Sequence, residues 1–172
     1  DAEALALMGG ELGACLGLAE GSRLVVLDGG DETVRLLGEI GGAAAGAMVW
    51  VGEEAQITEA APTHILLTPE VLARLNPESV ASETVIAVMG LPFFAASMAG
   101  WQQRRVIGLW GTTLGTLCCA ALAMEKEEAV ISEPLPGCWI EILDEGLQRQ
   151  PVDLWGGIYV GGRAMSSQQP PA

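Results

Sequence analysis

The segment Arg23–Val51, RLVVLDGGDETVRLLGEIGGAAAGAMVWV, contains the pattern that predicts the fold of this chain. Its run Leu24–Leu27 is short and wholly apolar, as in a strand buried on both faces. Asp31 then stands where a helix N-cap is expected, and the apolar residues after it recur at helical spacing. A second short apolar run, Ala47–Val51, predicts another buried strand. Strand, helix and strand in this order predict two parallel strands joined by a covering helix.

The same alternation continues on both sides of this segment. Residues 1–18 have apolar positions at helical spacing, and Thr68 followed by Pro69 is typical of a helix start. A further helix is expected over Pro92–Arg104, with Arg104 and Arg105 near its C-terminal end. Strands are expected near residues 24, 48, 65, 85 and 106. We therefore predict an α/β fold with one mainly parallel, doubly wound sheet and helices on both of its faces.

The pattern changes after Gly111. The segments CWIEILDE (138–145) and GGIYVGG (156–162) follow one another through turns, with no helix between them. This predicts a small antiparallel C-terminal appendage on the parallel core. We expect one domain over residues 1–165, and a polar, proline-rich tail over 166–172 that frays. The chain opens without an initiator Met, as expected for a piece of something larger.

Composition narrows the classes of partner. Half of the 172 residues are apolar and 17% are charged, and 22 acidic residues against 8 Lys and Arg give a net charge of −14. Nucleic acid and anionic membrane surfaces bind clustered cations, so neither is expected as a partner. We interpret the acidity as a contribution to solubility. No membrane span or signal peptide is recognisable, which favours a cytoplasmic location.

No catalytic or metal-binding set is evident in the sequence. The only histidine is His64, and the cysteines have no C-x-x-C spacing, so we expect no zinc site and buried, reduced thiols. His64 is interpreted as a packed or surface residue. Four tryptophans beside strand or helix ends are interpreted as core and rim packing: Trp101, Trp110, Trp139 and Trp155.

The order of these pieces resembles the large N-terminal part of adenylate-forming enzymes, especially the adenylation domains of nonribosomal peptide synthetases. Residues 16–50 are similar to an early strand-helix-strand passage of that family, and APTHILLTPEVLARL (61–75) to its V-T-x-x-x-x-x-P-S-x-x-x-x-L. VIGLWGTTLGT (106–116) falls where the family has N-x-Y-G-P-T-E. Residues 133–165 match its G-x-P-I-x-N-x-x-x-x-x-L-D and G-E-L-x-I-x-G. The shared order covers nearly the whole chain.

The resemblance also shows which functional residues are changed. The family's phosphate loop, rich in Ser, Thr and Gly and ending in Lys-Gly, would fall between Trp50 and Pro62. Only the acidic VGEEAQITEAA (51–61) lies there, as if the middle of the domain were deleted. We expect this junction to form a brief helix or tight loop over the sheet edge.

The family's second nucleotide loop is altered as well. If Trp110 replaces the family Tyr, then Gly111 and Thr113 match, while Thr112 replaces Pro and Leu114 replaces a Glu that helps to hold magnesium. Gly157 similarly stands where the family has Glu. The family's ribose-binding Asp and catalytic Lys would lie beyond Met165. The only lysine of this chain, Lys126, is interpreted as part of a solvated face.

We therefore interpret the chain as a degenerate, internally truncated pseudo-adenylation domain with a structural or docking role in a peptide or polyketide synthetase. The resemblance implies no catalytic residue, metal or cofactor, and only a vestigial nucleotide loop at Gly111, Thr112 and Thr113. The expected partners are neighbouring synthetase domains, including a phosphopantetheine carrier protein, or a second copy of this chain. The deletion would uncover an apolar docking face that includes Met48, Trp50, Phe93 and Phe94.

Two other interpretations stay open. The chain could be an adenylate-forming enzyme whose site is completed by a partner. It could also be a Rossmann-like module, alike by chance, that binds a small ligand at the carboxyl ends of its strands.

Overall fold

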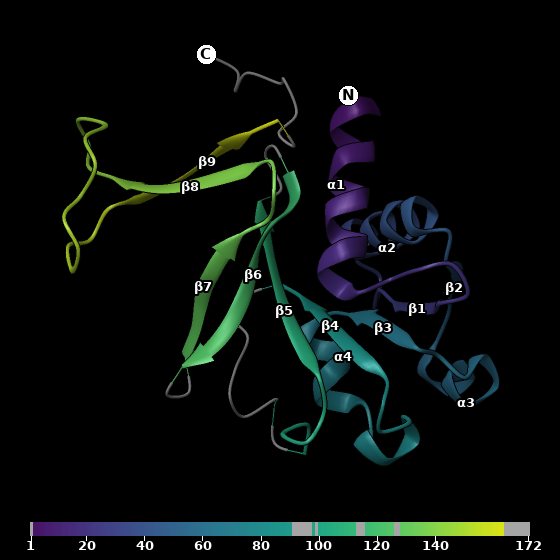
Figure 1. Cartoon of the computed structure of the whole chain (residues 1–172). Helices are drawn as coiled ribbons and strands as arrows, with labels where there is room; N and C mark the ends of the chain where they lie inside the picture. The colour runs from purple at the N-terminus through teal and green to yellow at the C-terminus, as the bar shows by residue number, and fades with distance from the viewer. Residues whose placement is uncertain (1, 91–97, 99, 113–115, 126–127, 164–172) are drawn as a thin grey trace.

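The computed structural model describes residues 2–90, 98, 100–112, 116–125 and 128–163. A seven-stranded sheet with the order β2-β1-β3-β4-β5-β6-β7 forms the body, and β8 and β9 form a separate two-stranded sheet (Figure 1). The strands are β1 Arg23–Leu27, β2 Met48–Val51, β3 His64–Leu67, β4 Val85–Met89, β5 Val106–Thr112, β6 Thr116–Glu125, β7 Glu128–Pro134, β8 Cys138–Leu143 and β9 Gly157–Gly162. The helices are α1 Ala2–Leu16, α2 Glu32–Ala45, α3 Ile57–Ala60 and α4 Pro69–Arg74, with 3₁₀ turns η1 Glu54–Gln56 and η2 Pro77–Ser79.

The first five strands are parallel, as the alternation of strands and helices predicts. β6 and β7 then continue the same sheet in antiparallel orientation. The predicted α/β class with an antiparallel C-terminal part is confirmed. The antiparallel part is divided, because β6 and β7 extend the main sheet whereas β8 and β9 leave it.

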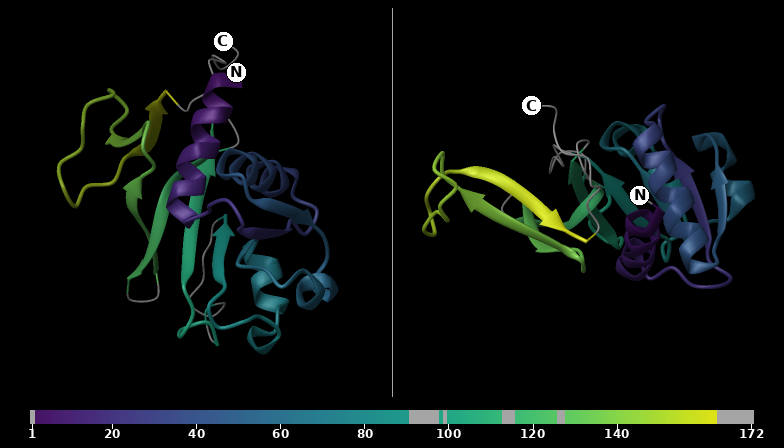
Figure 2. Two further views of the ribbon diagram at one scale, coloured as in Figure 1. Left: turned by 45° about the vertical axis from the view of Figure 1, so that its right-hand side comes forward. Right: turned by 90° about the horizontal axis from the view of Figure 1, so that it is seen from above.

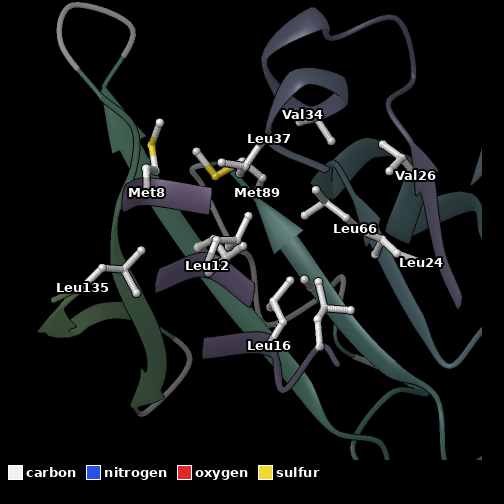
Figure 3. Close-up of a cluster of buried hydrophobic side chains, with 13 residues drawn as sticks. Met8, Leu12, Leu16, Leu24, Val26, Val34, Leu37, Leu66, Met89 and Leu135 are labelled. Atoms are coloured by element: carbon white, nitrogen blue, oxygen red, sulfur yellow. The ribbon is translucent and has the colours of Figure 1, made fainter. Parts of the chain in front are cut away.

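Alternate residues of each parallel strand face opposite layers, which produces two cores. Leu24, Val26 and Leu66 pack under α1 and α2, in the cluster drawn in Figure 3. Val25 and Ile65 face the other way and pack with residues of α3 and α4. Helices therefore cover both faces of the sheet, as expected from strands that are apolar at every position. The views in Figure 2 show α1 and α2 together on one side of the strands.

The helix caps that the sequence predicts form at the predicted residues. Asp31 is the N-cap of α2, and its side chain accepts hydrogen bonds from the backbone N–H groups of Thr33 and Val34. Thr68 caps α4 in the same way, with Pro69 at the first helical position. α2 ends at Gly46, whose φ of 67° favours glycine because a Cβ is strained in the left-handed region.

The expected helix over Pro92–Arg104 lies largely outside the described residues, since 91–97 and 99 are not described. Residues 100–103 form turns, so the described end of this segment is not helical. Trp101 is nevertheless buried in the core next to α4, as predicted. Arg104 does not cap a helix there. It donates hydrogen bonds to the carbonyl groups of Pro77, Val80 and Ala81, and so fastens the turn around η2.

Candidate functional site

The carboxyl ends of the parallel strands are the place where an open α/β sheet binds ligands. The strand order 2-1-3-4-5 places a topological switch point between the neighbouring strands β1 and β3, the second and third of the seven-stranded sheet. A cavity of about 450 Å³ opens beside it, between the loop after β1, the loop after β2 and helix α4. Its lining consists of Leu27, Asp28, Gly29, Gly30, Gly52, Glu53, Glu54, Ala55, Val71 and Arg74.

The loop after β1 uses its polar groups internally. The Asp28 carboxylate accepts a hydrogen bond of 2.8 Å from the backbone N–H of Gly30. Gly29 and Gly30 have φ angles of 60° and 93°, so the turn requires glycine at both positions. At the start of α2, the Asp31 carboxylate already occupies the anion-binding end of the helix. This loop is therefore a turn and a cap, as interpreted from the sequence, and offers no free phosphate cradle.

The lining of the cavity carries more negative than positive charge. Asp28, Glu53 and Glu54 are the carboxylates of the described lining, and Arg74 is its one cation. The guanidinium Nη2 of Arg74 lies 3.1 Å from Glu54 Oε1, so this cation is already paired. A phosphate entering here would meet more negative than positive charge.

The junction 51–61 forms one side of this cavity. It folds into the 3₁₀ turn η1 and the one-turn helix α3, which confirms the expected brief helix. Its only large apolar residue beyond Val51, Ile57, is buried against the cluster that includes Trp101. The backbone N–H of Glu53 donates to the side-chain oxygen of Gln56 at 2.9 Å. The segment is a compact connection over the sheet and bears no resemblance to a phosphate loop.

Two of the three predicted nucleotide-loop residues, Gly111 and Thr112, are described, and neither is among the described residues that line this cavity. Gly111 and Thr112 are the last residues of β5, where the pairing with β6 shifts register between Trp110 and Thr112. Thr113 and Leu114 lie outside the described residues, as do the positions that follow Gly90 at the end of β4. The described lining of the cavity comes instead from the loops after β1 and β2 and from α4.

The predicted docking face is divided between surface and core. Met48 and Trp50 lie on the same side of β2, which is the outermost strand on that side of the sheet. Met48 is 65% exposed, whereas Trp50 is half-buried and packs against the core next to α4. Phe93 and Phe94 lie outside the described residues.

A second cavity, of about 570 Å³, opens at the amino ends of the strands and includes Thr63, His64 and Arg105 in its lining. His64 is 9% exposed, and its Nδ1 lies 2.9 Å from Thr63 Oγ1. Burial lowers the pKa of His64, a hydrogen bond with the backbone of Leu16 opposes this shift, and the nearby Arg105 adds to it. The histidine therefore joins the end of α1 to β3, and the sequence interpretation of a packed residue is confirmed.

Three further features of the described part of the chain bear on its chemistry: possible metal ligands, apolar helices and cysteine thiols. No group of three or more His, Cys, Asp or Glu side chains there is arranged to hold a metal ion. No described helix combines the length and the apolar character needed to cross a bilayer. Cys15 and Cys138 are both half-buried, and burial raises the pKa of the Cys138 thiol.

Sequence reasoning missed the most exposed aromatic residue. Trp155 was expected to pack, but it is 98% exposed in the loop between β8 and β9. Trp139 of β8 is also exposed over about half of its surface. Residue type alone gave no signal for this, because a tryptophan is usually buried.

Comparison with known proteins places this geometry in context. No family model matches the chain. Among curated proteins, it is 31% identical over 114 residues to chondramide synthase cmdD of Chondromyces crocatus, a match that covers 60% of this chain and 3% of that protein. It is 26% identical over 107 residues to novobiocin biosynthesis protein H of Streptomyces niveus, covering 60% of this chain and 18% of that protein. The chain thus spans a small part of each curated relative.

Solved structures match over almost the whole chain. The N-terminal subdomain of Klebsiella oxytoca NpsA, in complex with 3-hydroxybenzoyl-AMSN, has a TM-score of 0.74 at 15% identity, covering 92% of this chain and 47% of that one. CmiS6 has a TM-score of 0.77 at 22% identity, covering 94% and 45%. NpsA-ThdA, an artificially fused adenylation-PCP di-domain from the same Klebsiella species, has a TM-score of 0.72 at 16% identity, covering 92% and 34%.

The chain has an adenylation-domain-like fold. The resemblance predicted from the order of the motifs is confirmed at this level. The match includes less than half of the NpsA N-terminal subdomain, so the truncation inferred from the sequence agrees with the comparison.

Proposed function

We propose that this chain is a non-catalytic pseudo-adenylation domain that acts as a structural or docking element within a multidomain peptide or polyketide synthetase. The observation that carries the proposal is the acidic cavity at the carboxyl ends of β1 and β2, whose one described cation is paired with Glu54. The alternative enzyme would need a partner chain to supply the missing charge.

The physical argument concerns the triphosphate. Adenylation requires a site that holds phosphate groups and their magnesium ion in place, because catalysis of phosphate chemistry depends mainly on positioning and charge stabilisation. Here the junction between β2 and β3 contributes Glu53 and Glu54 in place of a cationic loop. The starts of α2 and α4 are both capped by side chains, so neither is free to bind an anion.

The context of the relatives supports a role beside other domains. Chondramide synthase is a synthetase, and the NpsA-ThdA structure joins an adenylation domain to a PCP. We infer that the partners of this chain are neighbouring synthetase domains, including a carrier protein. The free thiol of Cys138 is typical of a reducing compartment, which supports a cytoplasmic location.

The proposal is tested by calorimetric titration with MgATP and by acid-dependent pyrophosphate exchange. We expect neither binding nor exchange from the folded chain. Micromolar MgATP affinity would contradict the proposal and would favour the partner-completed enzyme. A Glu53→Lys variant serves as a matched probe. If repulsion is the reason for the lack of binding, this variant should bind inorganic pyrophosphate more tightly than the unmodified chain does.

The proposed docking face at β2 is tested with a pair of charged variants. Because Met48 is exposed, Met48→Glu should leave the chain folded, whereas Trp50→Glu places a charge against the core and should destabilise it. Loss of association with a neighbouring synthetase domain in the folded Met48→Glu variant would support docking there. Retained association would show that Met48 is an ordinary surface residue.

The cavity gives specific support to one other function, a small-ligand-binding module. Its volume of about 450 Å³ lies within the range of ligand sites in proteins. Its carboxylates would select a cationic molecule over an anionic one. Thermal-shift measurements with matched small amines and carboxylic acids distinguish this function, since only the amines should raise the melting temperature.

A further inference from the structure

A cavity of about 570 Å³ lies at the amino ends of the strands, on the opposite edge of the sheet from the acidic cavity. Four neighbouring strands begin beside it, in the order β1, β3, β4 and β5. The end of α1, the helix α3 and the turn after η2 complete its walls. Its volume lies within the range of small-molecule sites in proteins. We call it the amino-end cavity.

The amino-end cavity concentrates positive charge in an acidic chain. Arg23 and Arg105 line it, and Glu83 is the one carboxylate of its described lining. The whole chain has 22 acidic residues against 8 Lys and Arg. The acidic cavity at the other edge has three carboxylates and a single arginine in its described lining. An anion is therefore attracted to the amino ends of the strands and repelled from their carboxyl ends.

Neither arginine of the amino-end cavity is neutralised by a carboxylate in the described structure. The ion pairs there belong to three other arginines: Arg35, Arg74 and Arg149. Among the described residues, Arg105 forms no side-chain hydrogen bond, and Arg23 forms one, through Nε. Glu83 accepts a hydrogen bond of 3.0 Å from Ser82 Oγ instead. Guanidinium groups with donors to spare bind carboxylates through two parallel N–H···O bonds.

Arg23 is held in place before any ligand binds. Its Nε donates to the carbonyl oxygen of Ala61 at 2.7 Å, and its backbone N–H donates to Thr63 Oγ1 at 2.9 Å. Ala61 has a φ of 42°, a left-handed conformation that costs energy for a residue other than glycine. A side chain that is already oriented loses less freedom when it binds a ligand, so Arg23 is the better placed of the two cations.

Arg105 contributes its charge from the far side of the cavity. β1 and β5 are separated by β3 and β4, which puts their backbones roughly 14 Å apart. Burial lowers the pKa of His64 in the same lining, and the positive charge of Arg105 lowers it further. His64 is therefore neutral at neutral pH, and two arginines against one carboxylate leave the lining with one positive charge. A ligand with a single negative charge balances it.

The rest of the lining favours a ligand with an apolar body. Pro62 stands before β3 and Val85 begins β4, so both lie between β1 and β5 in the sheet. Each methylene group that a ligand buries against them contributes favourably to binding. An inorganic anion has no such group and would lose water there without this gain.

We propose that the amino-end cavity binds a small aliphatic carboxylate, whose carboxyl group pairs with Arg23 and whose apolar body lies towards Pro62 and Val85. Arg105 adds attraction from a distance. The site uses no residue of the acidic cavity, so its test is independent of the proposal that the chain is a pseudo-adenylation domain.

The test uses the nuclear magnetic resonance signals of His64 in the full chain. His64 is the only histidine of the sequence and lies in the lining, so its ring signals report on the amino-end cavity. Isovalerate, a short branched carboxylate, should shift these signals with a Kd of about 1 mM or less at low ionic strength. Isovaleramide has the same shape without the charge and should leave the signals unchanged.

Four variants test the role of the charges. Arg23→Met should weaken isovalerate binding at least about tenfold, because it removes the cation that pairs with the carboxyl group. Arg105→Met should weaken binding about threefold, and Glu83→Gln should strengthen it by a similar factor, because these charges act from a distance. Arg163→Met is the matched control. Arg163 is exposed, lies outside the described lining and forms no ion pair in the described structure, so the Kd should not change.

The variants at Arg105 and Glu83 keep the test valid if Arg23→Met lowers the melting temperature, because both side chains are exposed and neither holds the backbone of another element. Weaker binding in Arg105→Met and stronger binding in Glu83→Gln, with Arg163→Met unchanged, support the proposal. An unchanged Kd in the first two variants would overturn it, as would the lack of any shift with isovalerate up to roughly 20 mM.

Three other results would also decide against the proposal. Equal binding of isovaleramide would show an apolar cavity in which charge plays no part. Equal weakening in Arg105→Met and Arg163→Met would show unspecific attraction of anions to the chain. Tighter binding of inorganic phosphate than of isovalerate would refute the assignment of the ligand as a carboxylate.

Discussion

Replacing Gly9 by Ala should destabilise this chain, although Ala is the better helix former. Gly9 is buried in α1, where that helix crosses α2. A Cβ at this position would lie 2.5 Å from Cγ2 of Ile40, 2.9 Å from its carbonyl oxygen and 3.2 Å from its carbonyl carbon. The side chain of Ile40 can rotate, but its backbone belongs to α2 and cannot move unless the helix does. The two helices must therefore separate to admit the methyl group.

The size of the effect follows from two opposing contributions. Ala gains about 1 kcal/mol over Gly in a helix interior. Overpacking a close contact costs about 1–3 kcal/mol, and contact with backbone atoms places this case towards the upper limit. We expect a net loss of roughly 1–2 kcal/mol. For a chain of this length, that loss lowers Tm by roughly 2–8 °C.

The adjacent Gly10 provides the control for this prediction. A Cβ at Gly10 would meet no atom within 4 Å, so Gly10→Ala gains helix propensity without a clash and should raise stability by up to about 1 kcal/mol. Both variants are compared with the unmodified chain by urea unfolding, followed by circular dichroism. If Gly9→Ala proves as stable as Gly10→Ala, the close crossing of α1 and α2 is wrong, and with it the packing of the core in Figure 3.

Two further predictions concern polar groups of the body. Burial lowers the pKa of His64 from its ordinary value of 6.5, so the unfolded state binds a proton on this residue more tightly than the folded state does. The free energy of unfolding should therefore fall as the pH drops through 6.5. His64→Gln should remove this part of the pH dependence when the urea midpoint is measured against pH. Arg104→Met removes three hydrogen bonds to the carbonyl groups around η2 and should lower the free energy of unfolding by about 1–3 kcal/mol in urea titrations. Its exposed neighbour Arg105 makes no hydrogen bond through its side chain in the described structure, so Arg105→Met should change the free energy of unfolding by less than about 0.5 kcal/mol. Equal losses of stability in the two variants would refute the role of the Arg104 hydrogen bonds.

The parallel core could be predicted because its signals are local. Short runs such as Leu24–Leu27 are apolar at every position, and Asp31 and Thr68 cap helices by bonding to N–H groups two or three residues away. Such contacts form within one segment, so the sequence pattern specifies them. The brief helix between β2 and β3 was expected because the twelve residues from Gly52 to Thr63 are too few for a larger unit between these strands.

The remaining features depend on contacts between distant residues. Whether β6 extends the main sheet depends on its pairing with β5, and the apolar pattern of a single strand does not reveal its neighbour. The charge of the candidate cavity is fixed by the pairing of Arg74 with Glu54, twenty residues away along the chain. Trp155 lies in the loop between β8 and β9 and is 98% exposed, which no property of the residue itself could indicate.

Most of the exposed large apolar residues of the described structure lie in one place, the β8–β9 hairpin and its loop. If the missing half of the domain had uncovered a surface at the junction, the side of β2 next to 51–61 would be open. Instead Ile57 closes that side by packing in the same cluster as Trp50, and Met48 is the exposed apolar residue that is left there. Both faces of the parallel sheet thus have a packed core in the described structure. The β8–β9 hairpin differs, because its two strands form no ladder with a third strand in the described structure and Cys138 at its base is its one residue packed on the main core. A search for the partner of this chain should therefore begin at this hairpin, with the edge of β2 as the second place to probe.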